Sequence, residues 1–120
     1  MTVAIPAADN NREAQADSRF GRAPWFYIRR ADGTDSFAPN TQNLNAAQGA
    51  GIQSAQNVLA QDANVVLTEH CGPKAFKVLS AGGVRIFAIP RGVALTEALA
   101  AYDRGELTEL SGADVEGHWV

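Results

Sequence analysis

Residues 64–75 combine several side chains that can bind a ligand within one short turn. The segment reads NVVLTEHCGPKA, so an apolar, β-branched run leads directly into Glu69, His70 and Cys71. A cysteine thiolate and a histidine nitrogen both suit copper or iron as ligands. Pro73 is typical of the first position of a helix, where free backbone N–H groups and the helix dipole attract anions. The segment therefore predicts a binding site for an anionic, metal-containing ligand.

A second group of candidate side chains lies in the polar stretch between residues 8 and 24. Five arginines occur between Arg12 and Arg30, and a guanidinium group makes charge-assisted hydrogen bonds to anions. The stretch has only weak helical periodicity, which indicates a loop. Loops longer than about 12 residues inside a compact domain are usually functional or disordered. We expect this loop to be mobile without a ligand and to contribute positive charge to a site.

Each candidate ligand also has an interpretation unrelated to binding. A single cysteine is most often a small buried hydrophobic residue, and His70 can be a solvated turn residue. A structural zinc site needs four ligands, and only His118 remains as a further histidine or cysteine. The sequence thus supports a binding site at residues 64–75 better than it supports any particular metal.

The elements that must position these residues alternate along the chain. Apolar and aromatic runs predict strands at 2–5 (closed by Pro6), 25–30, 34–38, 63–68 and 84–89. Helical spacing of apolar residues predicts helices at 46–61, from 73 to the glycines at 82 and 83, and at 94–104 before Gly105. Asp32-Gly33 predicts a hairpin turn. This order favours a mixed five-stranded sheet with helices on both faces.

Length and composition are those of a single globular domain. The chain has 120 residues, of which 46% are hydrophobic and 19% charged. We expect one α/β domain over residues 1–107 and an acidic, mobile tail over residues 108–120. The first residues lack the pattern of a signal peptide, and no apolar run reaches the roughly 20 residues of a membrane helix. The predicted location is therefore cytoplasmic.

The net charge of −3 is unevenly distributed along the chain. Residues 97–120 contain six acidic side chains against Arg104 alone, whereas residues 1–96 have a small excess of basic side chains. The body of the protein can therefore attract an anion locally. Nucleic-acid binding requires a broad basic face, which this composition does not supply. We expect neither a nucleic acid nor a membrane as partner.

Four pieces of the sequence, in this order, resemble one known family. They are Ile5-Pro6, SRFGRAP at 18–24, GAGIQSAQ at 49–56 and CGPKAF at 71–76. Over residues 2–107 the chain is similar to the dinitrogenase iron–molybdenum cofactor biosynthesis family, which includes NifX, NafY and the carboxy-terminal domain of NifB. Small stand-alone members of this length also resemble the molybdenum–copper orange protein of sulfate reducers.

The resemblance implies a fold and a place for the site. The fold is a ribonuclease H-like three-layer arrangement with sheet order 3-2-1-4-5 and the second strand antiparallel to the others. Ligands of such sheets favour the crevice beyond strands 1 and 4, where the chain winds away in opposite directions. The expected cofactor-binding residues are Ser18, Arg19, Phe20, Gly21, Arg22, His70, Cys71, Gly72 and Lys74, with Cys71 and His70 as metal ligands.

The resemblance also implies a carrier rather than a catalyst. We expect a non-enzymatic protein that holds an anionic metal–sulfur cluster, non-covalently or through Cys71, and exchanges it with a protein partner. A molybdenum–copper sulfide is the first candidate cluster, and an iron–sulfur or iron–molybdenum cluster is the second. Two alternatives stay open: a metal-free protein-interaction module, and a metal-dependent hydrolase that uses Asp9 and Glu69.

Overall fold

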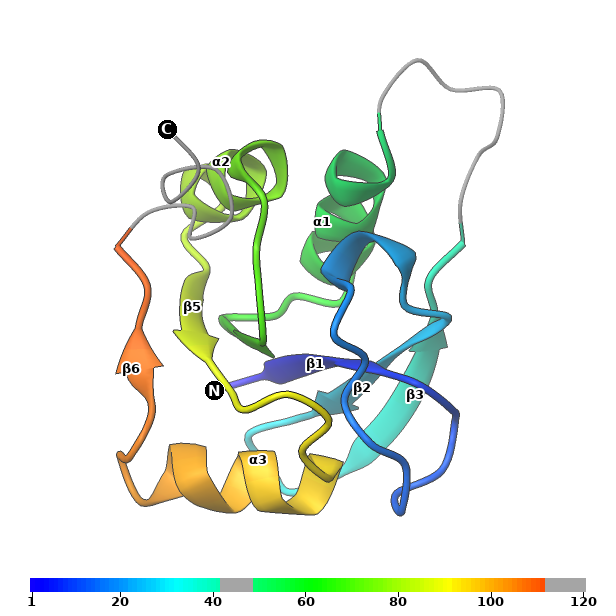
Figure 1. Cartoon of the computed structure of the whole chain (residues 1–120), viewed down its shortest axis with the longest axis vertical. Coiled ribbons are helices and arrows are strands. Elements are labelled where there is room, and N and C mark those ends of the chain that lie inside the picture. The colour runs from blue at the N-terminus through cyan, green and yellow to red at the C-terminus, as the bar shows by residue number, and fades with distance from the viewer. Residues whose placement is uncertain (42–48, 112–120) are drawn as a thin grey trace.

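The computed structural model describes residues 1–41 and 49–111, which form one mixed sheet with helices on both faces (Figure 1). The strands are β1 (Val3–Ala7), β2 (Trp25–Arg29), β3 (Asp35–Pro39), β4 (Val65–Thr68), β5 (Arg85–Ala88) and β6 (Thr108–Glu109). The helices are α1 (Ala50–Ala60), α2 (Pro73–Ala81) and α3 (Leu95–Asp103), with a short 3₁₀ helix, η1 (Phe20–Arg22). The sequence patterns therefore locate every α-helix and five of the six strands in the described chain.

The sheet has the strand order β3-β2-β1-β4-β5-β6. Strand β1 pairs in parallel with β4, and β4 pairs in parallel with β5. Strand β2 is antiparallel to both β1 and β3. The predicted order 3-2-1-4-5 with an antiparallel second strand is confirmed as part of this larger sheet. The ribonuclease H-like assignment stays a prediction.

The expectation of five strands was wrong because β6 lies in the segment that was expected to be a tail. Thr108 and Glu109 pair antiparallel with β5, and the Leu110 N–H donates to the Ile86 carbonyl at 2.8 Å. Arg85 and Glu109 form an ion pair across the two strands at 2.6 Å. A two-residue strand carries almost no periodic signal, so these contacts are visible only in three dimensions. Residues 112–120, which include His118, lie outside the described residues.

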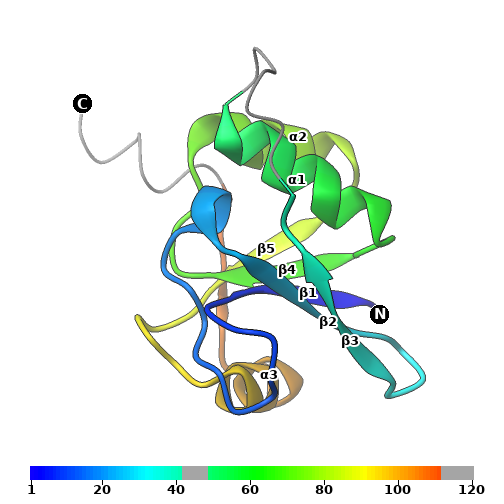
Figure 2. The same ribbon diagram turned by 90° about the vertical axis from the view of Figure 1, so that its right-hand side faces the viewer.

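Each face of the sheet packs against its own helices (Figures 1 and 2). Ala4 and Val66 belong to the core under α1 and α2. Their neighbours Val3 and Val65 belong to the core that packs on α3. Successive strand side chains point to opposite faces, so the central strands must be apolar throughout. This explains why β1 and β4 read as continuous apolar runs.

Pro6 lies within β1 and does not end it, contrary to the expectation from the sequence. The parallel pairing with β4 stops at Ala4, while the pairing with β2 continues to Ala7. The Pro6 carbonyl accepts a hydrogen bond from the Asp17 N–H at 2.8 Å. Its backbone therefore faces away from β2, where no ladder requires the N–H that proline lacks.

The helix ends follow the predicted signals with one correction. Pro73 is the first residue of α2. Helix α3 ends at Asp103 with Arg104 as its C-cap, and Gly105, whose φ is +72°, follows. Helix α1 begins at Ala50 with Gly49 as its N-cap, later than the predicted residue 46; residues 46–48 lie outside the described residues. Of the helices that the structure describes, none combines the length and apolar character needed to cross a bilayer.

Candidate functional site

A pocket of about 480 Å³ opens beyond the carboxyl ends of β1 and β4. Its walls come from three segments that are far apart in sequence: residues 18–21 after β1, Gly51 in the first turn of α1, and residues 70 and 72–75 after β4. The two loops that were expected to meet at this edge of the sheet therefore do meet. Parallel strands deliver their carboxyl ends to one edge, which is why distant loops converge there.

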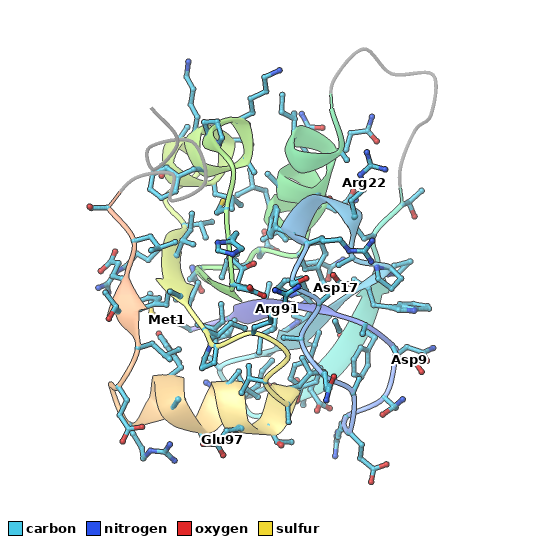
Figure 3. The ribbon with its side chains drawn as sticks, in the orientation of Figure 1. Met1, Asp9, Asp17, Arg22, Arg91 and Glu97 are labelled. Atoms are coloured by element: carbon cyan, nitrogen blue, oxygen red, sulfur yellow. The ribbon has the colours of Figure 1, made fainter. Side chains whose placement is uncertain are left out.

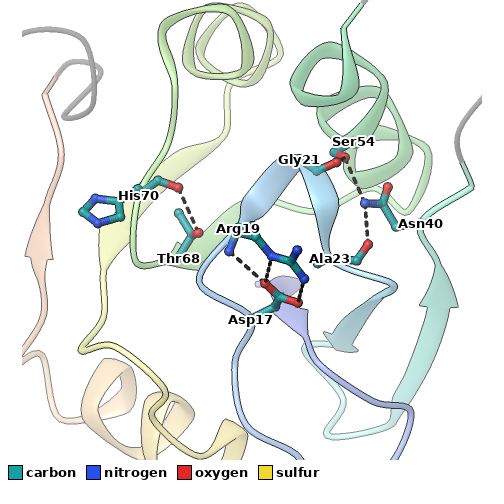
Figure 4. A network of polar contacts seen from close by, with 8 residues as sticks. All are labelled: Asp17, Arg19, Gly21, Ala23, Asn40, Ser54, Thr68 and His70. Carbon is teal, nitrogen blue, oxygen red and sulfur yellow. Dashed lines mark hydrogen bonds and ion pairs between the residues drawn. The ribbon is translucent and has the colours of Figure 1, made fainter.

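The loop after β1 is held against the sheet and presents Arg19 at the pocket. The Ala8 N–H donates to the Gln15 carbonyl at 3.0 Å, and the Asp17 N–H donates to the Pro6 carbonyl at 2.8 Å. Asp17 is buried, and its carboxylate accepts hydrogen bonds from Arg19 Nε and Nη2, both at 3.2 Å (Figure 4). These hydrogen bonds, followed by Coulombic attraction, raise the pKa of the Arg19 guanidinium.

Helix η1 packs against the start of α1 through two glycines. A Cβ atom on Gly21 would lie 3.0 Å from the Gly51 nitrogen and 3.2 Å from its Cα. Phe20 is buried beside them, with its ring centroid 5.3 Å from that of Phe26. Close backbone approach requires a residue without a side chain. The close approach therefore requires glycine at position 21, whereas a Cβ atom on Gly51 would meet only the Ala75 Cβ, at 3.5 Å.

A buried polar network fixes the same contact from the side (Figure 4). Asn40 Nδ2 donates to the Ala23 carbonyl at 2.8 Å and to Ser54 Oγ at 2.9 Å. Ser54 Oγ in turn donates to the Gly21 carbonyl at 3.1 Å. The network joins η1, the end of β3 and α1, so it holds the pocket wall in place. Sequence patterns do not reveal Asn40 and Ser54, because buried polar pairs have no periodic signature.

The turn between β4 and α2 forms the opposite wall. The Thr68 hydroxyl donates to the His70 carbonyl at 3.1 Å, which shapes the turn. His70 Nε2 lies 3.3 Å from Glu69 Oε1, and the His70 side chain is 54% exposed. The His70 ring points away from Arg19 in Figure 4. His70 therefore belongs to the pocket lining as a largely exposed residue.

Several features of the pocket lining favour an anionic ligand. The N-cap residue of both α1 and α2 is a glycine, so the N-cap residue offers no side-chain hydrogen bond to the first N–H groups of either helix. Residues of both first turns line the pocket, so their N–H groups and helix dipoles favour an anion there. Arg19 and Lys74 add two positively charged side chains, of which Arg19 is paired with the Asp17 carboxylate beneath it. Among the lining residues of the described chain, none is acidic.

Seven of the nine predicted binding residues line this pocket. They are Ser18, Arg19, Phe20, Gly21, His70, Gly72 and Lys74. Arg22, the last residue of η1, is exposed and does not line the pocket. In the view of Figure 3 its side chain lies above η1, and Asp17 lies below. The structure adds Gly51, Pro73 and Ala75 to the lining, and Asp17 beneath it. Of these, only Pro73 had a chemical signal in the sequence, as the first residue of a helix.

Cys71 lies in the core beneath the pocket. Its side chain is fully buried among residues that include Phe20, Ala75 and Leu79. Residues 70 and 72 line the pocket on either side of it. The structure thus places the sulfur behind the pocket wall, and metal ligation by Cys71 and His70 stays a prediction.

The alternative hydrolase residues lie in separate surroundings. Asp9 is on an exposed bend at the outer edge of the molecule, where its carboxylate accepts a hydrogen bond from the Asn10 N–H at 2.8 Å (Figure 3). Glu69 pairs with His70. Within residues 1–41 and 49–111, no three His, Cys, Asp or Glu side chains gather as a metal site.

Comparison with known proteins identifies the family. The sequence model described as "Dinitrogenase iron-molybdenum cofactor" matches residues 1–105. The chain belongs to this family. The match confirms the resemblance that the four sequence pieces indicate. No curated protein matches the chain significantly.

Solved structures extend this comparison to the three-dimensional fold of the family. The chain is similar to the apo form of the orange protein from Desulfovibrio gigas, with a TM-score of 0.87 and 29% identity over 94% of this chain and 95% of that chain. It is also similar to a putative NifB protein from Thermotoga, described as a member of the DUF35 family. In that case the TM-score is 0.80, with 27% identity over 97% of this chain and 98% of that chain.

Proposed function

We propose that this protein is a non-enzymatic carrier that binds an anionic metal–sulfur cluster in the pocket between η1 and the start of α2. The cluster is its cargo, received from or delivered to a protein partner in the cytoplasm. The observation that carries the proposal is the pocket itself: it joins Arg19, Lys74 and two helix N-termini around about 480 Å³, with no acidic residue in its described lining.

Non-covalent attachment fits the side chains that face the pocket. Metal–sulfur clusters are usually anionic, and backbone N–H groups in concave sites bind such anions. Arginine adds hydrogen bonds in a fixed planar geometry. The thiol of Cys71 is fully buried, so it does not offer its sulfur to a ligand in this conformation. We therefore assign the binding to charge and hydrogen bonds rather than to a sulfur–metal bond.

The nature of the cargo rests on the family. The family description names the iron–molybdenum cofactor, and the similar orange protein was solved in a form called apo, which implies a loaded form of that protein. A molybdenum–copper sulfide is our first candidate cargo. An iron–sulfur or iron–molybdenum cluster is the second.

A titration of the purified protein with tetrathiomolybdate and Cu(I) under anaerobic conditions tests this proposal. We expect a coloured complex that survives desalting, with NMR amide shifts concentrated at residues 18–21 and 70–75. The double variant Arg19→Gln/Lys74→Gln removes two positive charges from the pocket and should bind the cluster at least about tenfold more weakly.

Arg22→Gln is the control for removing a positive charge from this loop outside the pocket. Arg22 carries the same charge and belongs to the same loop, but it does not line the pocket; this variant should retain the cluster like the wild type. Equal retention by Arg19→Gln/Lys74→Gln would show that the pocket is not the site. A protein that retains neither this cluster nor an iron–sulfur cluster would leave the metal-free interaction module as the better interpretation.

A further inference from the structure

The carboxylate of Asp17 is a buried charged group that is hydrogen-bonded to the pocket residue Arg19. Its side chain is only 8% exposed. It accepts hydrogen bonds from three groups of one residue: the Arg19 backbone N–H at 2.9 Å, Nε at 3.2 Å and Nη2 at 3.2 Å. A carboxylate is costly to bury unless its partners compensate. The three hydrogen bonds from Arg19 therefore compensate for the cost of burying the Asp17 carboxylate.

The backbone of Asp17 is attached to the sheet, so the carboxylate is a fixed point. Its own N–H donates to the Pro6 carbonyl at 2.8 Å, and the preceding Ala16 N–H donates to the Val93 carbonyl at 2.8 Å. Ala16 also forms a bridge with Ala7 at the end of β1. The end of β1 and the loop before α3 therefore hold the backbone at Ala16 and Asp17 in place.

Arg19 is fixed by this carboxylate although most of its side chain is in solvent. Its side chain is 65% exposed, and a long exposed side chain normally samples many rotamers. A guanidinium group has five N–H donors in a rigid fork. Asp17 engages the Nε edge through Nε and Nη2 (Figure 4). The pair therefore leaves the Nη1 donors of Arg19, a residue that lines the pocket, outside its hydrogen bonds.

We propose that Asp17 is a positioning residue that holds the Arg19 guanidinium ready for an anion in the pocket. This inference rests on the proposed function. An arginine that is already ordered loses less conformational entropy when a ligand binds, so binding is tighter. The negative charge of Asp17 works against an anionic ligand, and salt screens this repulsion only weakly because the carboxylate is buried. Removal of the charge alone would therefore tighten binding, so that a loss of affinity in Asp17→Asn reports the lost positioning of Arg19.

A double-mutant cycle between Asp17 and Arg19 separates positioning from charge. We expect Asp17→Asn to weaken binding of the thiomolybdate–copper probe about fivefold in the wild-type background. In the Arg19→Gln background the same change should not weaken binding, because Asp17 then has no guanidinium group to position. Equal weakening in both backgrounds, or no weakening in the wild type, would overturn the proposal.

Two further measurements exclude a general effect on stability. Asp103→Asn is the matched control, because it removes one charge and breaks a two-bond pair with Arg29, at 2.7 and 2.9 Å, at the end of α3; it should leave affinity unchanged. In the ligand-free protein, the Arg19 Nε–H should exchange slowly with solvent in the wild type and rapidly in Asp17→Asn. Rapid exchange in the wild type would refute the positioning even if the cluster binds. Protected Nε–H groups without any cluster binding would instead refute the proposed function and, with it, this role of Asp17.

Discussion

Cys71 and Arg19 belong to segments on opposite walls of the same pocket, and their surroundings give them different roles. Cys71 stands between two residues that line the pocket, yet its side chain has no exposed surface. Arg19 is on a loop and mostly exposed, but a buried carboxylate orders it. At the scale of single residues, burial and the nearest partner therefore decide which group meets the ligand.

Replacement of Cys71 by alanine tests whether its sulfur is a ligand. We expect Cys71→Ala to keep at least half of the affinity for the cluster, because the buried sulfur does not face the pocket. The variant should lower the free energy of unfolding by about 1 kcal/mol, since it removes a buried atom from the core. Cluster titration and urea unfolding measure the two effects. Loss of the cluster by a folded variant would establish thiolate ligation instead.

The β2–β3 hairpin is the element with the clearest coupling between structure and pH. The Tyr27 hydroxyl donates to Asp35 Oδ2 at 2.6 Å, and the ring of Tyr27 lies 5.0 Å from that of Phe37 on the neighbouring strand. Burial, followed by the hydrogen bond to Asp35, raises the pKa of Tyr27 to about 12. The hairpin thus stabilises the protonated phenol relative to the unfolded chain.

The alkaline stability of the protein should follow from this shift. The pKa of Tyr27 in the folded state is above its ordinary value of 10.0, so the contribution of this residue is complete below pH 10 and is lost as the pH rises through about 12. We expect Tyr27→Phe to remove this part of the alkaline dependence in urea unfolding. Tyr102→Phe leaves the contact with Asp35 intact and is the control. Equal pH dependence in wild type and Tyr27→Phe would contradict the assignment.

The whole molecule combines an acidic net charge with a locally positive pocket. The net charge is −3, and the excess of acidic residues lies after residue 96. Helix α3 and β6, which belong to this acidic part, lie away from the pocket wall formed by η1 and α1 (Figures 1 and 2). Local charge can thus bind an anion on a protein that is acidic overall, because screening limits each charge to about 10 Å at moderate salt.

Cluster affinity should therefore decrease as salt concentration rises. We expect about a tenfold weaker affinity when salt increases from about 50 to about 500 mM, because Arg19 and Lys74 contribute through charge. The affinity of Arg19→Gln/Lys74→Gln should depend less steeply on salt. Titrations at several salt concentrations, with sucrose as an uncharged control, measure the slope. A salt-independent affinity would indicate binding through covalent or apolar contacts.

Much of the fold could be predicted because residues that are close together in the sequence specify each element. Apolar runs marked β1, β2, β4 and β5, and Pro73 marked the start of α2. Pro6 misled this approach, since a proline is tolerated in a strand once the neighbouring ladder has stopped. The sixth strand was missed because two residues cannot show a period.

The candidate site was predictable to the extent that topology alone positions it. The order of strands brings the loops after β1 and β4 to one edge, so seven of the nine expected residues line the pocket. Arg22 and Cys71 do not line it: Arg22 is exposed at the end of η1, and Cys71 is enclosed in the core. Asp17 was missed because its role depends on its burial and on the backbone hydrogen bonds that join Ala16 and Asp17 to distant residues, which no local pattern reveals.

The sequence by itself determined the order of elements, the family and the two segments that meet at the pocket, since periodicity, prolines and glycines act on their own neighbours. Only the tertiary structure decided which side chains of those segments face the ligand. That Gly21 touches Gly51 and that Cys71 is enclosed depend on contacts between residues distant in the chain. Asp17 and Arg19 are only two residues apart, but the Asp17 backbone is held by the distant Pro6 carbonyl. No local pattern encodes the direction in which such side chains point.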